Sequence, residues 1–255
     1  MKPYKDFAIE MAQYAGGVMR RNFTHGMEKV WKEDETPVTI TDTTINAHVL
    51  KALQKDYPDH SFIGEEGSFE KESSYVWICD PVDGTIPFSH AVPTFVFSLG
   101  LVKDGESILG VIYDPILDRM IIGEKGKGAF MNGKQIHVSE IKTLGTRTYM
   151  NYGFDEHPRG RDPFIEKGCF VSTLYTAVYA SMLVAMGEYV ADIYGYTKPW
   201  DAAAVKCIVE EAGGKVTDIQ GNAQRWDKPL NGYIASNGYV HEEILEMLNA
   251  PSLQK

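Results

Sequence analysis

The chain has 255 residues, of which 44% are hydrophobic and 24% are charged, and its formal net charge is -10 at pH 7. This composition is typical of a globular protein with a sizeable core and excludes a disordered chain. The acidic balance argues against a nucleic acid as partner, because such binding depends on clustered Lys and Arg side chains. It does not exclude a phosphorylated small molecule, because carboxylates that gather divalent cations present positive charge to a phosphate.

The N-terminus and the cysteines indicate the cellular compartment in which the protein is expected. Residues 3–23 have the pattern of an amphipathic helix and not that of a signal peptide, and no apolar run approaches the roughly 18 residues of a membrane span. Cys79, Cys169 and Cys207 are odd in number, far apart and in no zinc-binding spacing. We therefore expect a cytoplasmic protein that binds neither a membrane nor a nucleic acid.

The first third of the chain alternates helix and strand signals. After the helix over 3–23, the polar segment 26–41 predicts a loop, and a second helix capped by Thr41 or Asp42 follows to about residue 53. Two short β-type runs, 61–64 and 75–79, each end at acidic residues.

From residue 94 the pattern changes to β-rich runs at 94–102, 107–115 and 119–124, which predict antiparallel sheet. The later elements are helices over 173–187, 201–213 and about 240–250, and strands over 189–196, 215–219 and 233–237. Helices mixed with antiparallel strands, without a repeat or a linker, predict an α+β fold layered as an αβαβα sandwich.

Acidic residues stand at three junctions of these elements: Glu65 with Glu66, Asp80 with Asp83, and Asp201. Scaffolds position reactive groups at such junctions, and convergent carboxylates are ligands for Mg²⁺ in two-metal phosphoryl chemistry. The structural alternatives are a solvated turn for the glutamates and a helix N-cap for Asp201. The Asp80 segment favours a site most, because Gly84 lets backbone N–H groups approach an anion.

The order of these motifs identifies a family resemblance. An aspartate before DGT also occurs in the haloacid dehalogenase phosphatases, but their two aspartates stand two positions apart and here the spacing is three. The chain instead resembles the inositol monophosphatase superfamily. Five segments carry this resemblance in the family's order: PVTITD, SFIGEEG, WICDPVDGT, YDPILDRMIIGEKGKGAFMNGKQI and KPWDAAAVKCIVEEAGG.

The resemblance implies the αβαβα sandwich of the inositol monophosphatase and fructose-1,6-bisphosphatase type. It implies a single domain over residues 1–255, with a metal-motif half at about 1–140 and a second α/β half at about 141–255 that carries Trp200 and Asp201. A homodimer and lithium sensitivity are also implied.

The resemblance further implies a site that holds two or three Mg²⁺ ions. Its implied metal ligands are Glu65, Asp80, the carbonyl of Val82, Asp83 and Asp201. Glu65 and Thr85 are implied to orient the attacking water, with Asp42 in support. The implied substrate contacts are Asp83, Gly84, Thr85, Thr176, Ala177, Tyr194 and Asp201. Lys32 and Glu33 stand where relatives have a mobile loop that helps to bind a further ion.

Two tyrosines depart from the family's pattern and leave the substrate open. Tyr194 stands where an inositol phosphatase has a glutamate, seven residues before Asp201, and Tyr175 stands where a glycine precedes Thr176. A tyrosine cannot accept two hydroxyl hydrogen bonds as a carboxylate does. The two tyrosines either pack as core or interface aromatics or line a pocket for another leaving group, and Pro87 in IPF is a further departure.

The sequence thus predicts a phosphoric monoester hydrolase that acts through metal-activated water on a small phosphorylated metabolite like inositol 1-phosphate. The alternatives are the same chemistry on fructose 1,6-bisphosphate, histidinol phosphate, NADP or 3′-phosphoadenosine 5′-phosphate, or a catalytically silent phosphate-binding regulator. Because the implied catalytic and metal-binding residues are all present, the sequence argues against a catalytically silent regulator. We expect His90 to be structural, and Arg159 and Arg161 to lie in a surface loop.

Overall fold

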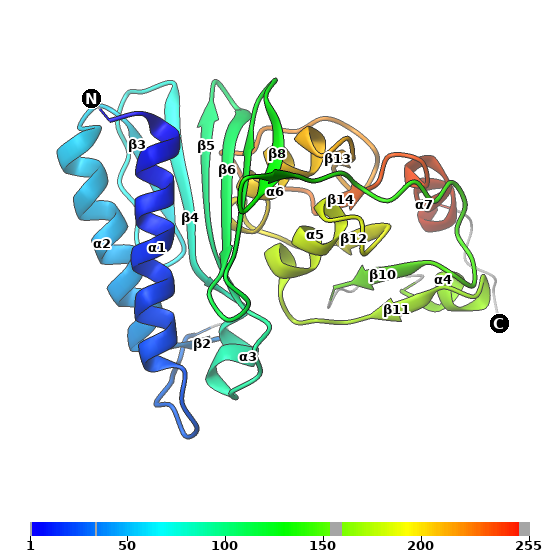
Figure 1. The fold of residues 1–255 in the computed structure, drawn as a ribbon, viewed down its shortest axis with the longest axis horizontal. Coiled ribbons are helices and arrows are strands. Elements are labelled where there is room, and N and C mark those ends of the chain that lie inside the picture. The colour runs from blue at the N-terminus through cyan, green and yellow to red at the C-terminus, as the bar shows by residue number, and fades with distance from the viewer. Residues whose placement is uncertain (1, 34, 154–159, 250–255) are drawn as a thin grey trace.

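The computed structural model of the protein describes residues 2–33, 35–153 and 160–249. Its elements form five layers, in the order helices, sheet, helices, sheet, helices (Figure 1). The outer layer on one side consists of α1 (Tyr4–Asn22) and α2 (Ile40–Asp56). The arrangement confirms the predicted α+β sandwich.

The larger sheet separates these helices from the middle layer. Its seven strands, in spatial order, are β3 (Ser61–Gly64), β4 (Tyr75–Asp83), β5 (Val96–Lys103), β6 (Glu106–Asp114), β7 (Arg119–Glu124), β8 (Gly128–Met131) and β9 (Lys134–Gln135). Neighbouring strands are antiparallel except β3 and β4, which are parallel. Because helices cover both faces, strand β5 is buried at every position except its last.

The smaller sheet lies on the other side of the middle helices. Its strands, in spatial order, are β11 (Phe170–Ser172), β10 (Tyr149–Tyr152), β12 (Ala191–Tyr194), β14 (Tyr233–Ser236) and β13 (Lys215–Thr217). Helices α4 (Asp162–Glu166) and α7 (His241–Asn249) form the last layer (Figure 1). The sequence did not reveal β10 and β11, because runs of four and three residues are too short for a period to be recognised.

Small residues allow the middle layer to approach the larger sheet closely. This layer consists of α5 (Ala177–Ala185) and α6 (Pro199–Glu211), and α6 contacts strands of both sheets. A Cβ atom at Gly110 would lie 2.3 Å from the carbonyl oxygen of Ala204, and one at Gly123 would lie 2.7 Å from the Cα atom of Ile208. This packing supports the single domain predicted over 1–255, which stays a prediction.

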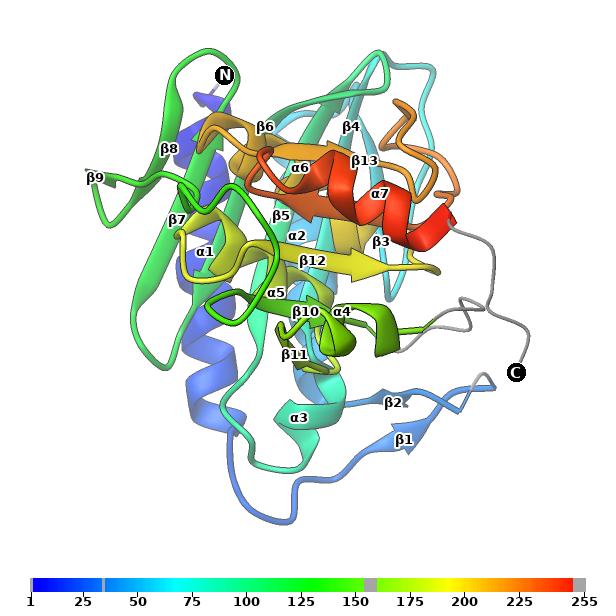
Figure 2. The ribbon, with the colours of Figure 1, turned by 90° about the vertical axis from the view of Figure 1, so that its right-hand side faces the viewer.

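The segment after α1 corrects two expectations. The predicted loop over 26–41 contains a short hairpin of β1 (Val30–Trp31) and β2 (Pro37–Val38), and β2 lies beside α3 (Thr85–Ser89) in Figure 2. Helix α2 is capped by Thr39, not by Thr41 or Asp42. Asp42 instead closes a capping box, since its Oδ2 accepts from the Thr39 N–H at 2.9 Å.

The starts of α5 and α6 also differ from the expectation. Helix α5 begins at Ala177 and not at residue 173, because Tyr175 has a left-handed φ of 35° and Thr176 is the extended N-cap. Helix α6 begins at Pro199 with Lys198 as its N-cap, so the N-cap alternative for Asp201 is wrong. Asp201 lies in the first turn instead.

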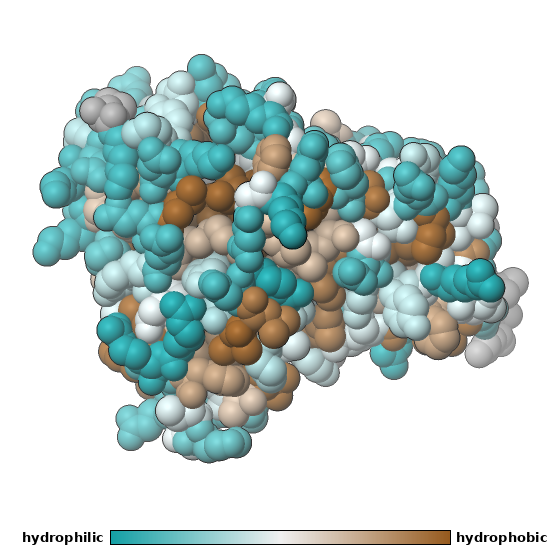
Figure 3. Space-filling model, in the orientation of Figure 1, coloured by the Kyte–Doolittle hydropathy of each residue, from teal (hydrophilic) through white to brown (hydrophobic). Residues whose placement is uncertain are grey.

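The outer helices pack on each other and present polar residues outward. The rings of Tyr14 on α1 and His48 on α2 stack with centroids 3.5 Å apart. Hydrophilic residues cover most of the surface over these helices (Figure 3). Among the described residues, no helix has the length and apolar character to cross a membrane.

We predict that Gly110→Ala lowers the free energy of unfolding by about 1–3 kcal/mol, because its Cβ would meet the backbone of Ala204 and separate α6 from the sheet. Denaturant unfolding measures this difference. The control is Gly17→Ala in α1, where a Cβ would meet nothing within 4 Å and should stabilise the helix by about 0.5–1 kcal/mol. Equal effects of the two substitutions would contradict this account of the packing.

Candidate active site

Three carboxylates converge where β4 ends and α6 begins. Asp80, Asp83 and Asp201 each offer a carboxylate oxygen, and these oxygens lie within 4.8 Å of one another. Residues three apart point to opposite faces of a regular strand, so Asp80 and Asp83 would not meet without a distortion. The pairing of β4 with β5 shifts register between these two aspartates, and such an irregularity redirects side chains.

The electrostatics of this cluster are unfavourable without a cation. Burial raises the pKa of all three carboxyl groups, and repulsion from neighbouring carboxylates raises the pKa of Asp80 and of Asp201 further, whereas hydrogen bonds at Asp83 oppose its rise. The pKa of Asp201 reaches about 8. Within the described part of the chain, no Lys or Arg forms a salt bridge with any of the three. These oxygen ligands could hold a divalent metal ion.

Backbone N–H groups fix the three carboxylates. Asp83 accepts from the N–H groups of Ala177 and Tyr179 at the start of α5, each at 3.0 Å, and from the Thr176 hydroxyl. Oδ1 of Asp80 accepts from the Val82 N–H at 3.0 Å, and Oδ2 of Asp201 accepts from the Lys198 N–H at 2.6 Å. The start of α5 therefore determines where Asp83 lies.

The hydroxyl of Thr85 is held between two acceptors. Its Oγ1 lies 2.9 Å from Asp42 Oδ1 and 3.0 Å from the carbonyl oxygen of Val82. Asp42 is fully buried, and burial raises its pKa although hydrogen bonds from Thr39 and Thr85 oppose this. A hydroxyl has one proton and two lone pairs, so Thr85 can donate to Asp42 and still accept from a water.

Gly84, which precedes Thr85, needs to be a glycine. Its φ is 88°, and a Cβ there would lie 2.7 Å from the carbonyl oxygen of Thr94. The turn from β4 into α3 thus depends on this residue.

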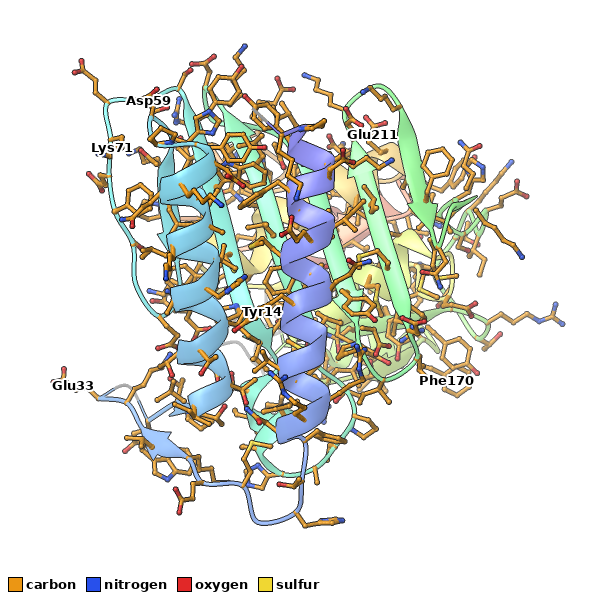
Figure 4. All side chains as sticks on the ribbon, turned by 60° about the vertical axis from the view of Figure 1, so that its left-hand side comes forward. Tyr14, Glu33, Asp59, Lys71, Phe170 and Glu211 are labelled. Carbon is orange, nitrogen blue, oxygen red and sulfur yellow. The ribbon has the colours of Figure 1, made fainter. Side chains whose placement is uncertain are left out.

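Glu65 lies beside the cluster but is paired with a lysine. Lys32 Nζ lies 2.8 Å from Glu65 Oε1 and also contacts Glu66, and both glutamate side chains are partly buried. The solvated-turn alternative for these glutamates is therefore wrong. Burial raises the pKa of Glu65 to about 7, against the effect of Lys32. Glu33 lies exposed at the tip of the hairpin and points away from the body of the protein (Figure 4).

A cavity of about 260 Å³ opens above the carboxylates. Its lining consists of Thr36, Pro37, Glu65, Asp80, Val82, Asp83, Gly84, Thr85, Ile86, Tyr175, Thr176, Ala177, Tyr194, Tyr196, Trp200 and Asp201. The lining includes every residue predicted to contact substrate. Sequence reasoning missed Thr36, Pro37 and Tyr196, and the only available signal was the position of Tyr196 close to the Trp-Asp motif.

Sequence reasoning also missed a buried carboxylate behind the cavity. Asp192 accepts from Asn151 Nδ2 at 2.8 Å, from the Ser181 hydroxyl at 2.6 Å and from the Tyr233 hydroxyl at 3.0 Å. Burial raises its pKa to about 7. The same tyrosine hydroxyl lies 3.2 Å from the carbonyl oxygen of Ala177, so this network reaches the first residue of α5.

Two basic side chains considered in the sequence, those of His90 and Arg161, are not part of the cavity lining. His90 is exposed, and its Nδ1 lies 2.8 Å from the carbonyl oxygen of Ile86, in keeping with a structural histidine. Arg161 is also exposed, with its Nη1 3.4 Å from Thr173 Oγ1. Arg159 lies outside the described residues.

The comparison with known proteins shows to which protein family the chain belongs. The model of the inositol monophosphatase family matches residues 1–252, and the chain therefore belongs to that family. The family is one of metal-dependent phosphatases.

Individual relatives agree with this membership. A fructose-1,6-bisphosphatase/inositol-1-monophosphatase from Thermotoga maritima is 34% identical, over 96% of this chain and 95% of the relative. A histidinol-phosphatase from Chlorobaculum parvum is 32% identical, over 96% of each chain. The solved structure of an IMPase from Thermotoga maritima has a TM-score of 0.87 at 32% identity, covering 96% of each chain. That of an inositol monophosphatase from Anabaena has a TM-score of 0.82 at 29% identity, covering 95% of this chain and 94% of the other.

We predict that Asp201→Asn stabilises the metal-free protein at pH 8 by roughly 5 kcal/mol, because each unit of difference between the folded and unfolded pKa is worth about 1.4 kcal/mol. The pKa of Asp201 is about 8 in the folded protein, above its ordinary value of 3.8. Its contribution to stability is therefore fully present below pH 3.8 and is lost as the pH rises through 8. Denaturant unfolding of the wild type and of Asp201→Asn in the presence of a metal chelator, measured from pH 5 to pH 8.5, checks this difference in stability.

The matched control is Glu106→Gln, which removes one partner of an exposed ion pair with Lys125. This change should alter stability by less than about 1 kcal/mol, with little dependence on pH. An Asp201→Asn variant less stable than the wild type at pH 8 would contradict the electrostatic account of the cluster.

Proposed function

We propose that the protein is a Mg²⁺-dependent phosphomonoesterase that hydrolyses a small phosphorylated metabolite like inositol 1-phosphate, with water as the nucleophile. The observation that carries this proposal is the convergence of Asp80, Asp83 and Asp201 within 4.8 Å under an open cavity. Carboxylate oxygens are the ligands that Mg²⁺ prefers, so the donor set fits two or three such ions. Glu65 and the carbonyl of Val82 complete the proposed ligands.

The proposed roles follow from the contacts of the side chains. Bound Mg²⁺ would supply a Lewis acid that makes water acidic and neutralises charge on the phosphoryl group. Thr85 would hold the attacking water, because Asp42 accepts its proton and leaves a lone pair toward the cavity. Glu65 would help Thr85 to orient this water after exchanging its partner Lys32 for a metal ion. Gly84 and Thr85 would direct N–H groups at the phosphate, and Asp83 and Asp201 would also contact the substrate.

The substrate contacts proposed at the sugar side are Thr176, Ala177 and Tyr194, all of which line the cavity. The names of two relatives favour alternatives with the same chemistry, on fructose 1,6-bisphosphate or histidinol phosphate. NADP and 3′-phosphoadenosine 5′-phosphate remain further alternatives. The homodimer, the cytoplasmic location and the lithium sensitivity stay predictions, and a silent regulator is disfavoured by the intact carboxylate cluster.

We expect Asp80→Asn to lower Mg²⁺-dependent phosphate release by roughly a hundredfold or more without unfolding the protein, since even residues that only support metal ligands contribute up to that factor. Release is measured over inositol 1-phosphate, fructose 1,6-bisphosphate, histidinol phosphate, NADP and 3′-phosphoadenosine 5′-phosphate. Asp104→Asn, in the exposed turn between β5 and β6, is the control and should keep wild-type rates. Full activity of Asp80→Asn would refute the proposal.

A further inference from the structure

A fully buried carboxylate lies behind the cavity and outside the proposed metal site. Asp192 is the second residue of β12, and its partner in register on β10 is Asn151; both residues are 0% exposed. Asp192 accepts hydrogen bonds from three side chains, which belong to β10, to β14 and to α5. An apolar side chain of similar shape, surrounded by apolar partners, is often as stable as such a buried polar group. Packing of the smaller sheet alone therefore does not account for an aspartate at this position.

The hydrogen bonds of Asp192 reach both ends of the α5 turn, the segment from Leu174 to Ala177 that leads into helix α5. At the first end, Asn151 donates from Nδ2 to Asp192 at 2.8 Å, and Asn151 Oδ1 accepts from the Leu174 N–H at 3.0 Å. At the second end, the Tyr233 hydroxyl lies 3.0 Å from Asp192 Oδ2 and 3.2 Å from the carbonyl oxygen of Ala177. Asp192 therefore links the two ends of the α5 turn through one side chain on each side.

The α5 turn and the residues directly after it hold Asp83 in the metal site. The hydroxyl of Thr176 donates to the Asp83 carboxylate, and the N–H groups of Ala177 and Tyr179 donate to it at 3.0 Å each. Because these three donors stand within four residues of one another, a shift of the α5 turn would move all of them together. The position of the Asp83 carboxylate relative to the other two aspartates therefore depends on the conformation of the α5 turn.

The backbone of the α5 turn is strained. Tyr175, in the middle of the turn, has a φ of 35°, in the left-handed region that residues other than glycine seldom adopt. Such a conformation persists only where the surrounding structure enforces it. The hydrogen bonds at Leu174 and at Ala177 restrain the residues on either side of Tyr175, and both of these bonds lead back to Asp192. The Asp192 network thus supplies the restraint that this turn requires.

We infer that Asp192 and Asn151 are positioning residues of the metal site, which hold the α5 turn in its strained conformation and thereby set the Mg²⁺ affinity of the carboxylate cluster. Neither residue is part of the cavity lining, so both act through Thr176, Ala177 and Asp83. The inference rests on the Mg²⁺-dependent activity proposed above. Substitution of residues that support metal ligands from behind lowers metal affinity or activity by roughly tenfold to a hundredfold.

The test uses Asn151→Asp, alone and combined with Asp192→Asn. In the single variant, two buried carboxylates face each other where an amide donated to a carboxylate, and their repulsion should release the α5 turn. The double variant exchanges the two side chains and restores every hydrogen bond. The carboxylate at position 151 then accepts from the Leu174 N–H and from the amide at position 192, whose oxygen accepts from the hydroxyls of Ser181 and Tyr233.

The dissociation constant of Mg²⁺, measured by calorimetric titration at pH 8, is the main readout. It should be at least roughly tenfold weaker in Asn151→Asp than in the wild type, and it should return to within roughly threefold of the wild type in the double variant. Hydrogen exchange in the metal-free protein is the second readout. The N–H groups of residues 174–179 should exchange faster in Asn151→Asp and at the wild-type rate in the double variant.

The matched control is Asn237→Asp, the same change at another buried asparagine. Asn237 donates from Nδ2 to the carbonyl oxygens of Ser139 and Ile141, which lie outside the metal site and the α5 turn. Asn237→Asp should lower Tm, because it loses these two hydrogen bonds, but it should leave the dissociation constant of Mg²⁺ unchanged. A purely structural role of Asn151 would give the same result as this control.

An unchanged dissociation constant in Asn151→Asp, or a loss that the double variant does not recover, would overturn the inference and leave the phosphatase proposal intact. If either of these variants fails to fold, Tyr233→Phe decides, because it removes the hydroxyl between Asp192 and Ala177. It should weaken Mg²⁺ binding by roughly threefold, and an unchanged affinity would overturn the inference. A wild-type protein that neither binds Mg²⁺ nor releases phosphate would instead overturn the phosphatase proposal.

Discussion

Mutual repulsion among buried carboxylates is the constraint on which the rest of the structure depends. Asp80, Asp83 and Asp201 come from two elements that are far apart in the sequence, and their oxygens lie within 4.8 Å. Burial and repulsion both disfavour their charged forms, so the site is costly to build without a cation. The fold holds it together through the register shift in β4 and the close contact of α6 with the larger sheet.

Each carboxylate is fixed by groups that lie outside the cavity. The start of α5 holds Asp83, and the buried Asp192 reaches the same turn through Tyr233. On the other side, the capping box at Thr39 fixes Asp42, which in turn holds Thr85. The N-terminal caps of α2 and α5 therefore serve two purposes. They satisfy the first turn of each helix, and they also position the residues proposed to act on the substrate.

The sequence predicted the layers and most of the cavity, because ordered motifs and apolar periods are local signals. It placed the carboxylates at the junctions where they occur. It could not predict that Lys32 contacts Glu65, since that pair depends on how the short hairpin folds back. It could not identify Asp192 as buried, because an aspartate in a four-residue strand does not reveal which face the sheet covers. The left-handed backbone of Tyr175 could not be predicted either, because tyrosine is not a residue type that signals such a conformation.

The central claim is that divalent cations neutralise this cluster. Calorimetric titration of Mg²⁺ into the metal-free protein at pH 7, repeated in two buffers with different ionisation enthalpies, tests it most directly. Because the pKa values of Glu65 and Asp201 are about 7 and 8, binding should expel protons from the carboxyl groups. The account predicts saturable binding with net proton release, both abolished in Asp80→Asn. Absence of binding, or binding that releases no proton and survives this substitution, would contradict it.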